Sequence, residues 1–397
     1  MPEIIGDSAL EPGSRVERIR RLLLANPRDG LLISGLANAL RLDDRPAQSL
    51  SWARWSVRPQ AWRAEEIDSR SLQILANALL DLGEYASAEV AYQRADPLGR
   101  SDVVQVCRSR ALLGLGKWRQ AWYLGEYRLP KQGRQPWNSA DPLVLCDEQG
   151  FGDTIQALRW LPALLARQSS LVRVRVRLPL LALLREGLRW LGPQLVLEAV
   201  SESNKSSDGS LLSIPAQLTL CSWAPAEVLK LSNGSIQSGC VRIALVWEAG
   251  RYQQSAAQAL EFRRKTLPDG VRYLLIRALR ERGIELVFLH QGYDLPSQAD
   301  FLDQARMLQA CDLLITVDTA AAHLGGAMGF PTWLLLPWAC ATRWQRCGKR
   351  TELYSSIRLF RQPRHQDWSG LIQGLLAQLD LWLASEAWLT NRKKSFS

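Results

Sequence analysis

Two kinds of hydrophobic pattern divide the 397-residue chain. In the front third, leucine and alanine recur at helical spacing, as in LANALLDLGEYASAEVAYQRADP at 75–97. After a polar stretch rich in turn formers, KQGRQPWNSADP at 131–142, short runs rich in valine, isoleucine and leucine alternate with helical stretches. The pattern predicts an all-α region followed by an α/β region.

The helical region contains repeats. LANAL occurs at 36–40 and 75–79, and a Leu-Gly pair at 82–83 recurs 33 residues later at 115–116. Each pair is followed by an aromatic residue, an alanine and then a proline, which suit a helix end, close packing of the next helix and its termination. Over roughly residues 30–130 this spacing resembles the tetratricopeptide family. The first copy departs from that family, because Asp44 replaces its glycine and Pro46 its aromatic residue.

Any array of helical hairpins needs such spacing, so the repeats alone predict no activity. Short stacks of this kind usually present a groove for a peptide or pack against a neighbouring domain.

The rest of the chain predicts two parallel sheets. Strands are expected at 143–146, 171–177 and 195–200, and in a second series at 241–247, 284–290, 312–318, 332–337 and 357–362. Helices lie between them, and an amphipathic helix is expected at 368–389. Strands that alternate with helices predict doubly wound sheets, here two Rossmann-like lobes with a cleft between them. Ligands bind such sheets beyond the carboxyl ends of the strands, so we expect the site residues in the loops there.

Length and composition narrow the class of protein. A chain of this length suggests two or three domains, and no apolar run approaches the roughly 20 residues of a membrane span. We expect no signal peptide at the N-terminus, which lacks a basic region followed by an apolar one. The seven cysteines form no Cys-x-x-Cys pair, which favours a reducing, cytoplasmic compartment. Three widely spaced histidines argue against a structural zinc site.

The net charge of +10 suggests an anionic partner. The alternating run VRVRVR at 172–177 places three arginines on one strand face, and a solvated face is the favoured interpretation. No RNA-recognition, zinc-finger or helix-turn-helix signature accompanies the charge, so nucleic acid is not an expected partner.

Three loops could carry chemistry, and the first follows the predicted strand at 312–318. Asp318 and Thr319 are expected to cap a helix, with His323 one turn into it and Gly325 allowing close packing. A helix N-terminus at the carboxyl edge of a strand is suited to a diphosphate. Equally, Asp318 could be only a cap and His323 a satisfied, half-buried residue.

The second loop, EAGRYQQSAAQALEFRRKTLP at 248–268, is long and basic. Lys265 lies next to a helix that begins at a proline, and it is the better candidate for neutralising a leaving diphosphate. For Arg263 and Arg264 we favour a solvated loop.

The third loop is EQGFGDTI at 148–155. It is neither a dinucleotide fingerprint, since a third glycine is missing, nor a P-loop, since Gly-Lys-Ser/Thr is absent. Gly150 and Gly152 place Asp153 at a helix N-terminus over the cleft. There the carboxylate could be a helix cap or could accept a proton from a bound hydroxyl.

Together the three loops, with LLLPW at 334–338 and SSIRLFRQP at 355–363, resemble bacterial tetratricopeptide proteins that carry a family 9-like, heptosyltransferase-like glycosyltransferase domain. The resemblance covers roughly residues 141–366. It implies the GT-B fold and an inverting, metal-independent reaction. It further implies that Asp153 is the general base, that Lys265 binds the donor's phosphates, and that Asp318, Thr319 and His323 contact the donor's sugar and diphosphate.

Two features depart from that family. Ala320 stands where many heptosyltransferases have glycine, and the first lobe is short and carries a serine-rich insert. Either departure could mean a changed substrate or a lost activity.

The sequence therefore predicts tetratricopeptide-like repeats at 1–138, a GT-B N-terminal lobe on the acceptor side at 139–238, and a C-terminal lobe on the sugar-nucleotide side at 239–397. The predicted catalytic residue is Asp153. The predicted substrate-binding residues are Gly150, Gly152, Lys265, Asp318, Thr319, His323 and Gly325, with no metal and no cofactor besides the nucleotide-diphosphate sugar as donor. The repeats are expected to hold a protein, lipid or glycan acceptor. The alternatives are a non-catalytic scaffold with a relic GT-B domain and, more distantly, a dehydrogenase.

Overall fold

The structure, a computed structural model, describes residues 12–58, 68–137, 142–201, 207–232, 239–250 and 255–385. The chain forms two compact units. Unit 1 comprises Met1–Lys131, Arg251–Arg264 and Ala339–Arg346, and unit 2 comprises Gln132–Gly250, Lys265–Trp338 and Cys347–Ser397. The predicted domain limits at 138–139 and 238 lie outside the described residues and stay predictions.

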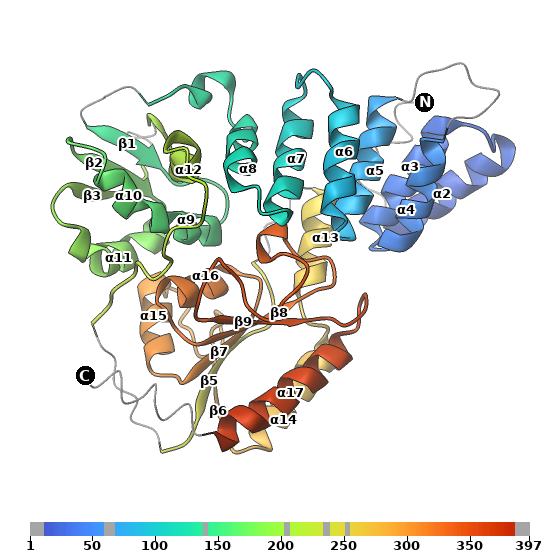
Figure 1. The fold of residues 1–397 in the computed structure, drawn as a ribbon. Helices are drawn as coiled ribbons and strands as arrows, with labels where there is room; N and C mark the ends of the chain where they lie inside the picture. The colour runs from blue at the N-terminus through green and yellow to red at the C-terminus, as the bar shows by residue number, and fades with distance from the viewer. Residues whose placement is uncertain are drawn as a thin grey trace. The chain divides into compact units, whose positions relative to one another are not determined.

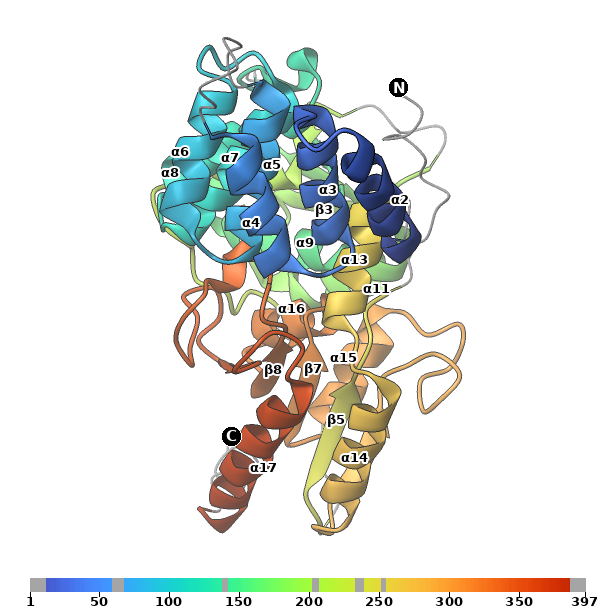
Figure 2. The same ribbon diagram turned by 90° about the vertical axis from the view of Figure 1, so that its right-hand side faces the viewer.

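Unit 1 is built mainly from a series of helices in which each contacts the next (Figure 1). They are α2 (Pro12–Ala25), α3 (Gly30–Leu42), α4 (Pro46–Ser56), α5 (Ser69–Asp81), α6 (Tyr85–Ala95), α7 (Asp102–Gly114) and α8 (Trp118–Gly125), followed by the short 3-10 turn η1 (Glu126–Arg128). Figure 2 shows the same helices in a quarter-turned view. The predicted helical hairpins are confirmed, whereas their assignment to the tetratricopeptide family stays a prediction.

The repeated Leu-Gly pairs end helices, as predicted. Leu82 is the C-cap of α5 and Leu115 that of α7, and Gly83 and Gly116 follow with φ of 75° and 69°. Glycine takes this left-handed conformation without the steric cost that a Cβ would add. In the first copy, Asp44 occupies the corresponding turn with φ of 57°. The turn is thus kept there although the glycine is not.

Two segments from the second half of the sequence belong to unit 1. One is α13 (Ala256–Lys265) up to Arg264, and the other contains the 3-10 turn η7 (Thr342–Trp344), which contacts α7. The prediction of a loop throughout 248–268 was wrong, because AAQALEFRRK at 256–265 forms a helix. Alanine, leucine, glutamate, arginine and lysine all have high helix propensity, which accounts for the difference. Arg251, which also belongs to this basic segment, lies outside the described residues.

The first sheet of unit 2 is parallel, in the order β3-β2-β1-β4. Its strands are β1 (Leu143–Cys146), β2 (Val172–Val176), β3 (Leu195–Ala199) and β4 (Gly209–Ser210). The helices and 3-10 turns of this region are η2 (Lys131–Arg134), α9 (Phe151–Ala157), η3 (Leu158–Trp160), α10 (Leu161–Leu165), α11 (Leu178–Gly187), η4 (Arg189–Leu191), η6 (Leu211–Ser213) and α12 (Ile214–Gln217). This order, 3-2-1-4, matches the first four strands of the Rossmann order 3-2-1-4-5-6.

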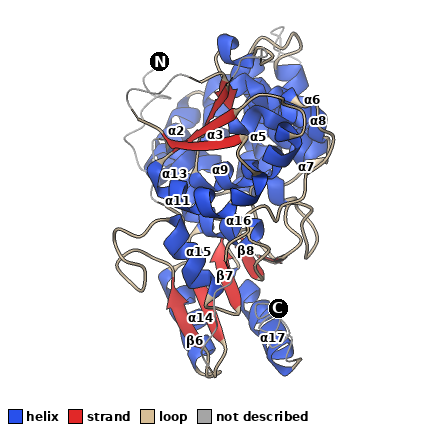
Figure 3. Ribbon diagram, turned by 90° about the vertical axis from the view of Figure 1, so that its left-hand side faces the viewer, coloured by secondary structure: helices blue, strands red, loops and turns tan. Residues whose placement is uncertain are grey.

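The second sheet is also parallel, in the order β6-β5-β7-β8-β9. Figure 3 labels β6, β7 and β8 among its strands. Its strands are β5 (Arg242–Val246), β6 (Glu285–Phe288), β7 (Leu313–Val317), β8 (Thr332–Leu336) and β9 (Ile357–Arg361). Its helices are α14 (Asp269–Arg280), α15 (Phe301–Gln309), α16 (Ala320–Ala327) and α17 (Trp368–Ala384). Leucines of α14 and α17 join the strands in one hydrophobic core. The order 2-1-3-4-5 is the other common doubly wound arrangement, so the predicted pair of parallel sheets is confirmed.

The arginines of VRVRVR lie on a partly exposed strand face, and two of them form ion pairs that the sequence did not predict. Arg173 and Arg175 both reach Glu198 of the neighbouring β3, at 2.5 and 3.2 Å, and the ion pairs hold the pKa of Glu198 below its usual value. The sequence pattern predicted strand β2 but not its neighbour Glu198, because residues that pair across two strands can be far apart in the sequence.

All seven cysteines are free thiols. Burial raises the pKa of Cys311 to about 12, in keeping with the predicted role of this residue as a small hydrophobe. Among the described residues, no helix is long and apolar enough to cross a membrane.

Candidate functional site

Asp153 lies in the first turn of α9, directly beyond the carboxyl end of β1. Its Oδ2 accepts a hydrogen bond from the backbone N–H of Gly150 at 3.1 Å, so the carboxylate does act as a helix cap. Gln149, which precedes Gly150, has φ of 60°, a left-handed conformation that is costly for a residue with a Cβ. Such strain is common where a loop is shaped for function. In the first sheet β2 and β3 lie on one side of β1, and β4 lies on the other side. The loop after β1 therefore follows a strand at the topological switch point of the sheet.

Gly152 brings the first lobe against the second. A Cβ at this position would lie 2.7 Å from His323 Cδ2 and 3.3 Å from Ala320 Cα, both in α16. Only glycine therefore permits α9 to pack on α16 this closely. Because α16 follows β7 at the switch point of the second sheet, the loops from the two switch points meet here.

Lys265 and Asp318 form an ion pair. Lys265 Nζ lies 3.0 Å from Asp318 Oδ2, and the two side chains are 18% and 6% exposed. Lys265 is the last residue of α13 rather than the entry to the next helix, which begins after Pro268 as its N-cap. Asp318 follows β7 directly, so the pair lies at the carboxyl edge of the sheet.

Thr319 occupies the N-cap position of α16, as predicted, but its side chain makes no capping hydrogen bond. Its Oγ1 lies 3.3 Å from the hydroxyl of Thr316 instead. The predicted capping bond from the Thr319 side chain was therefore wrong, whereas Asp318 pairs with Lys265 and its capping role stays a prediction.

His323 is 3% exposed, and its Nδ1 lies 2.8 Å from the hydroxyl of Tyr354. The structure thus gives this histidine a buried hydrogen-bonding partner, one of the two interpretations left open by the sequence. Tyr354 comes from the segment before β9 and had no signal in the sequence, since its role depends on contact with α16.

Gly325 packs α16 onto the sheet. A Cβ there would lie 2.5 Å from Thr332 Oγ1 and 3.1 Å from Leu314 Cδ2, and one at Gly326 would overlap the ring of Tyr354. Packing accounts for both glycines, and a contact of Gly325 with a ligand stays a prediction.

Two arginines that the sequence did not single out for the site surround α9. Arg177 pairs with Asp147 at 2.7 Å and lies over the ring of Phe151, 4.2 Å from its centroid. Arg159 is buried, and its guanidinium carbon lies 4.6 Å from the ring centroid of Tyr354 in the other lobe. Burial lowers the pKa of Arg159, and Tyr354 opposes that effect. These contacts orient the Asp153 helix and bind the lobes to each other.

An aromatic cluster lies at the carboxyl ends of β5 and β6. The backbone N–H of Trp247 donates to His290 Nε2 at 3.2 Å, and the two rings lie 3.8 Å apart. Burial, with a smaller effect of Arg272, lowers the pKa of His290 to about 4. His290 is therefore a neutral hydrogen-bond acceptor near pH 7.

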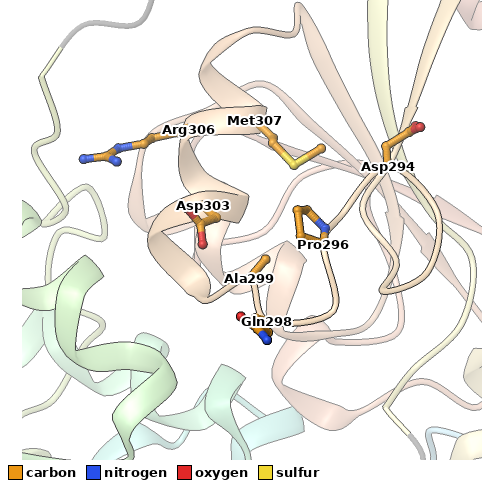
Figure 4. Close-up of a pocket in the computed structure, with 7 residues that line it drawn as sticks. All are labelled: Asp294, Pro296, Gln298, Ala299, Asp303, Arg306 and Met307. Atoms are coloured by element: carbon orange, nitrogen blue, oxygen red, sulfur yellow. The ribbon is translucent and has the colours of Figure 1, made fainter.

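A pocket separate from these residues lies beside α15 (Figure 4). It is lined by Asp294, Pro296, Gln298, Ala299, Asp303, Arg306 and Met307. None of the predicted site residues is among them.

No protein-family model and no curated protein matches the sequence. Several solved structures are similar to the chain. The ADP-heptose lipopolysaccharide heptosyltransferase II of E. coli is 14% identical, with a TM-score of 0.42 over 62% of this chain and 99% of that one. A family 9 glycosyl transferase from Veillonella parvula is 10% identical, with a TM-score of 0.40 over 64% and 98%. An O-GlcNAc transferase variant from Thermobaculum terrenum is 13% identical, with a TM-score of 0.30 over 98% and 91%.

At such identities and TM-scores, chemistry has to be inferred from the site itself. The helix that carries a half-buried carboxylate at one switch point packs on the helix that begins beside the Lys265–Asp318 pair at the other. The carboxylate can accept a proton, while the ammonium and the N-terminus of α16 can hold an anion.

Proposed function

We propose that the chain is a GT-B glycosyltransferase of the family 9 type that moves a sugar from a nucleotide-diphosphate sugar to an acceptor hydroxyl. The observation that carries the proposal is the packing of α9 on α16 at Gly152, which brings the Asp153 loop to the helix that follows Asp318. Each loop follows a strand at the switch point of a parallel sheet, where such folds bind ligands. The motifs that resemble the heptosyltransferases supply the same residues.

Lys265 and the N-terminus of α16 would hold the donor's diphosphate. The Asp318 carboxylate pairs with the Lys265 ammonium and restrains its long side chain. A lysine and a helix N-terminus both attract phosphate, and their positive charge opposes the negative charge that builds up on the leaving group. In this proposal they do so without a metal ion.

Asp153 would be the general base. Its hydrogen bond from Gly150 uses one of the roughly four lone-pair sites of a carboxylate, so accepting a proton is compatible with the capping role. As the acceptor oxygen attacks the anomeric carbon, its proton passes to Asp153. The bond from that carbon to the diphosphate oxygen breaks, and its electron pair leaves with the nucleoside diphosphate. One displacement of this kind inverts the anomeric centre.

The helices of unit 1 would bind the acceptor as tetratricopeptide-like repeats, with a protein as the favoured acceptor. Exposed residues on these helices include Leu31, Val90, Val103 and Tyr123, which offer apolar contacts to a peptide. The free thiols fit the predicted reducing, cytoplasmic compartment.

A non-catalytic scaffold is not favoured, because a scaffold has no need for a carboxylate loop packed against an anion-binding helix. Calorimetry with a panel of nucleotide-diphosphate sugars and transfer assays with the tightest-binding donor test the proposal. We expect Asp153→Asn to leave donor binding within about twofold and to lower turnover by about 10²-fold or more. If the wild-type chain binds no nucleotide sugar, the enzyme proposal is wrong, and unchanged turnover in Asp153→Asn removes this residue from its role.

A further inference from the structure

Three side chains form a buried series within unit 2, in the order Arg159, Tyr354 and His323. They are 2%, 1% and 3% exposed. The guanidinium carbon of Arg159 lies 4.6 Å from the ring centroid of Tyr354, and the Tyr354 hydroxyl lies 2.8 Å from His323 Nδ1. Gly326 makes room for the tyrosine, because a Cβ there would overlap its ring. Helix α16 thus presents His323 and Gly326, three residues apart on one face, to the same aromatic side chain.

Arg159 forms no ion pair with a carboxylate among the described residues. Burial is the largest effect on its pKa and lowers it, whereas the charge of Tyr354 and a hydrogen bond to its side chain raise it. A buried charge needs a compensating contact, and Tyr354 supplies one here. Because a guanidinium has only donors, the Tyr354 oxygen is the acceptor toward Arg159. The hydroxyl proton is then directed to His323 Nδ1.

A hydrogen bond accepted at Nδ1 determines the tautomer of His323. A neutral imidazole carries one proton, so accepting at Nδ1 places that proton on Nε2. A second proton on the ring would add a positive charge to a buried cluster that already contains the Arg159 guanidinium, and like charges repel strongly where water is excluded.

The protonated nitrogen lies on the edge of the ring that faces the Asp153 loop. Nε2 is bonded to Cδ2, and Cδ2 is the atom that lies 2.7 Å from the position of a Cβ at Gly152. Gly152 directly precedes Asp153 in the first turn of α9. The series from Arg159 therefore ends in an N–H group beside the proposed catalytic carboxylate.

We propose that Arg159 and Tyr354 are positioning residues that hold His323 as the Nε2-protonated tautomer, so that it donates a hydrogen bond to a phosphate oxygen of the nucleotide-diphosphate sugar. The inference rests on the proposed function, because only that scheme places a diphosphate at the N-terminus of α16. Arg159 and Tyr354 act through His323 and touch no substrate. His323 keeps its proton, and its hydrogen bond opposes the negative charge that builds up on the diphosphate as the bond to the sugar breaks.

The tautomer is measured directly by long-range proton–nitrogen NMR spectra of the full chain with isotope-labelled histidine. The chain has three histidines, so the spectrum is simple, and His323→Gln assigns the signals. His290 is an internal reference for the opposite tautomer, because its Nε2 accepts from the backbone N–H of Trp247 at 3.2 Å. At neutral pH we expect a proton on Nε2 of His323 and none on Nδ1. A proton on Nδ1, with or without one on Nε2, overturns the proposal.

Tyr354→Phe removes the hydroxyl that bonds to Nδ1. We expect signals of the Nδ1-protonated form of His323 to emerge. We also expect kcat and kcat/KM for the donor to fall equally, by about fivefold or more, because the interaction strengthens in the transition state. Arg159→Met removes the charge but keeps a long side chain, and we expect a smaller shift in the same direction. A His323 spectrum or a kcat unchanged by Tyr354→Phe overturns the positioning role, and the wild-type spectrum tests the tautomer even if this variant fails to fold.

Tyr92→Phe is the matched control. The Tyr92 hydroxyl is also buried and donates to Asn77 Oδ1 at 2.7 Å, but it lies in unit 1. Its removal costs a comparable hydrogen bond, so we expect a similar drop in melting temperature, with kcat within about twofold of wild type and an unchanged His323 spectrum. If Tyr92→Phe lowers kcat as much as Tyr354→Phe, the loss reflects stability and the proposal is wrong.

Failure of the proposed function is distinguishable from failure of this inference. A wild-type chain that shows the expected tautomer but transfers no sugar refutes the proposed function, and with it the catalytic task of the tautomer. A chain that transfers sugar but carries the proton on Nδ1 refutes the positioning role alone.

Discussion

Replacing Gly152 by alanine tests the junction between the two lobes. The added Cβ would lie 2.7 Å from His323 Cδ2, so one side must move by about 0.7 Å to reach the 3.4 Å of an ordinary contact. The histidine ring cannot easily move, because it is buried and bonded to the hydroxyl of Tyr354 at 2.8 Å. The nearest backbone atom, Ala320 Cα at 3.3 Å, also resists.

Overpacking of this kind costs about 1–3 kcal/mol, and we expect Gly152→Ala to lower the free energy of unfolding by that amount in urea denaturation. Turnover should fall further than stability, because displacement of a reacting group by close to 1 Å can cost about 10²-fold. The assay is transfer from the donor found by calorimetry, with the concentration of folded enzyme set by circular dichroism.

Gly374→Ala is the control for the substitution itself. Gly374 lies inside α17 with nothing within 4 Å of an added Cβ, so alanine there should stabilise the chain by up to about 1 kcal/mol. His323→Ala should partly rescue Gly152→Ala, since it removes the atom that clashes. Wild-type stability and turnover in Gly152→Ala would refute the close packing of α9 on α16.

The remaining predictions concern charge, pH and one hydroxyl. Lys265→Gln keeps the length of the side chain but removes its charge, and we expect kcat to fall about 10²-fold, with a weaker dependence of nucleoside-diphosphate binding on salt. The pKa of His290, lowered by burial and by Arg272 to about 4, lies below the value of about 6.5 in the unfolded chain, so the unfolded chain takes up the proton first. The free energy of unfolding should therefore fall by about 1–2 kcal/mol as the pH drops from 6.5 towards 4, and His290→Gln should remove that part of the slope in denaturation curves. Tyr354→Phe takes away the buried partner of His323, and a loss of about 1–3 kcal/mol in the unfolding free energy is expected, while equal stability would show that the bond contributes nothing.

Much of the fold and the loops of the candidate site could be inferred from local patterns. Apolar runs marked the strands of both sheets except the short β4, and the Leu-Gly pairs marked the helix ends at Gly83 and Gly116, because each depends on residues close in sequence. Asp153 and Asp318 could be chosen as candidate site residues because glycine-rich or capped turns after apolar runs are typical of the carboxyl edge of a parallel sheet. For these features, steric limits on the backbone and the burial of one face are sufficient.

The tertiary structure alone decided which side chains meet. Arg264 looked like part of a solvated loop until α13 brought it to Asp44 and Asp81. Two arginines of VRVRVR gained Glu198 as a partner only because β3 pairs with β2. A buried charge needs a partner to offset its lost hydration, and that partner can come from any part of the chain. Sequence spacing therefore determined where strands, turns and candidate groups lie along the chain, whereas packing determined which of the charges are solvated and which are paired.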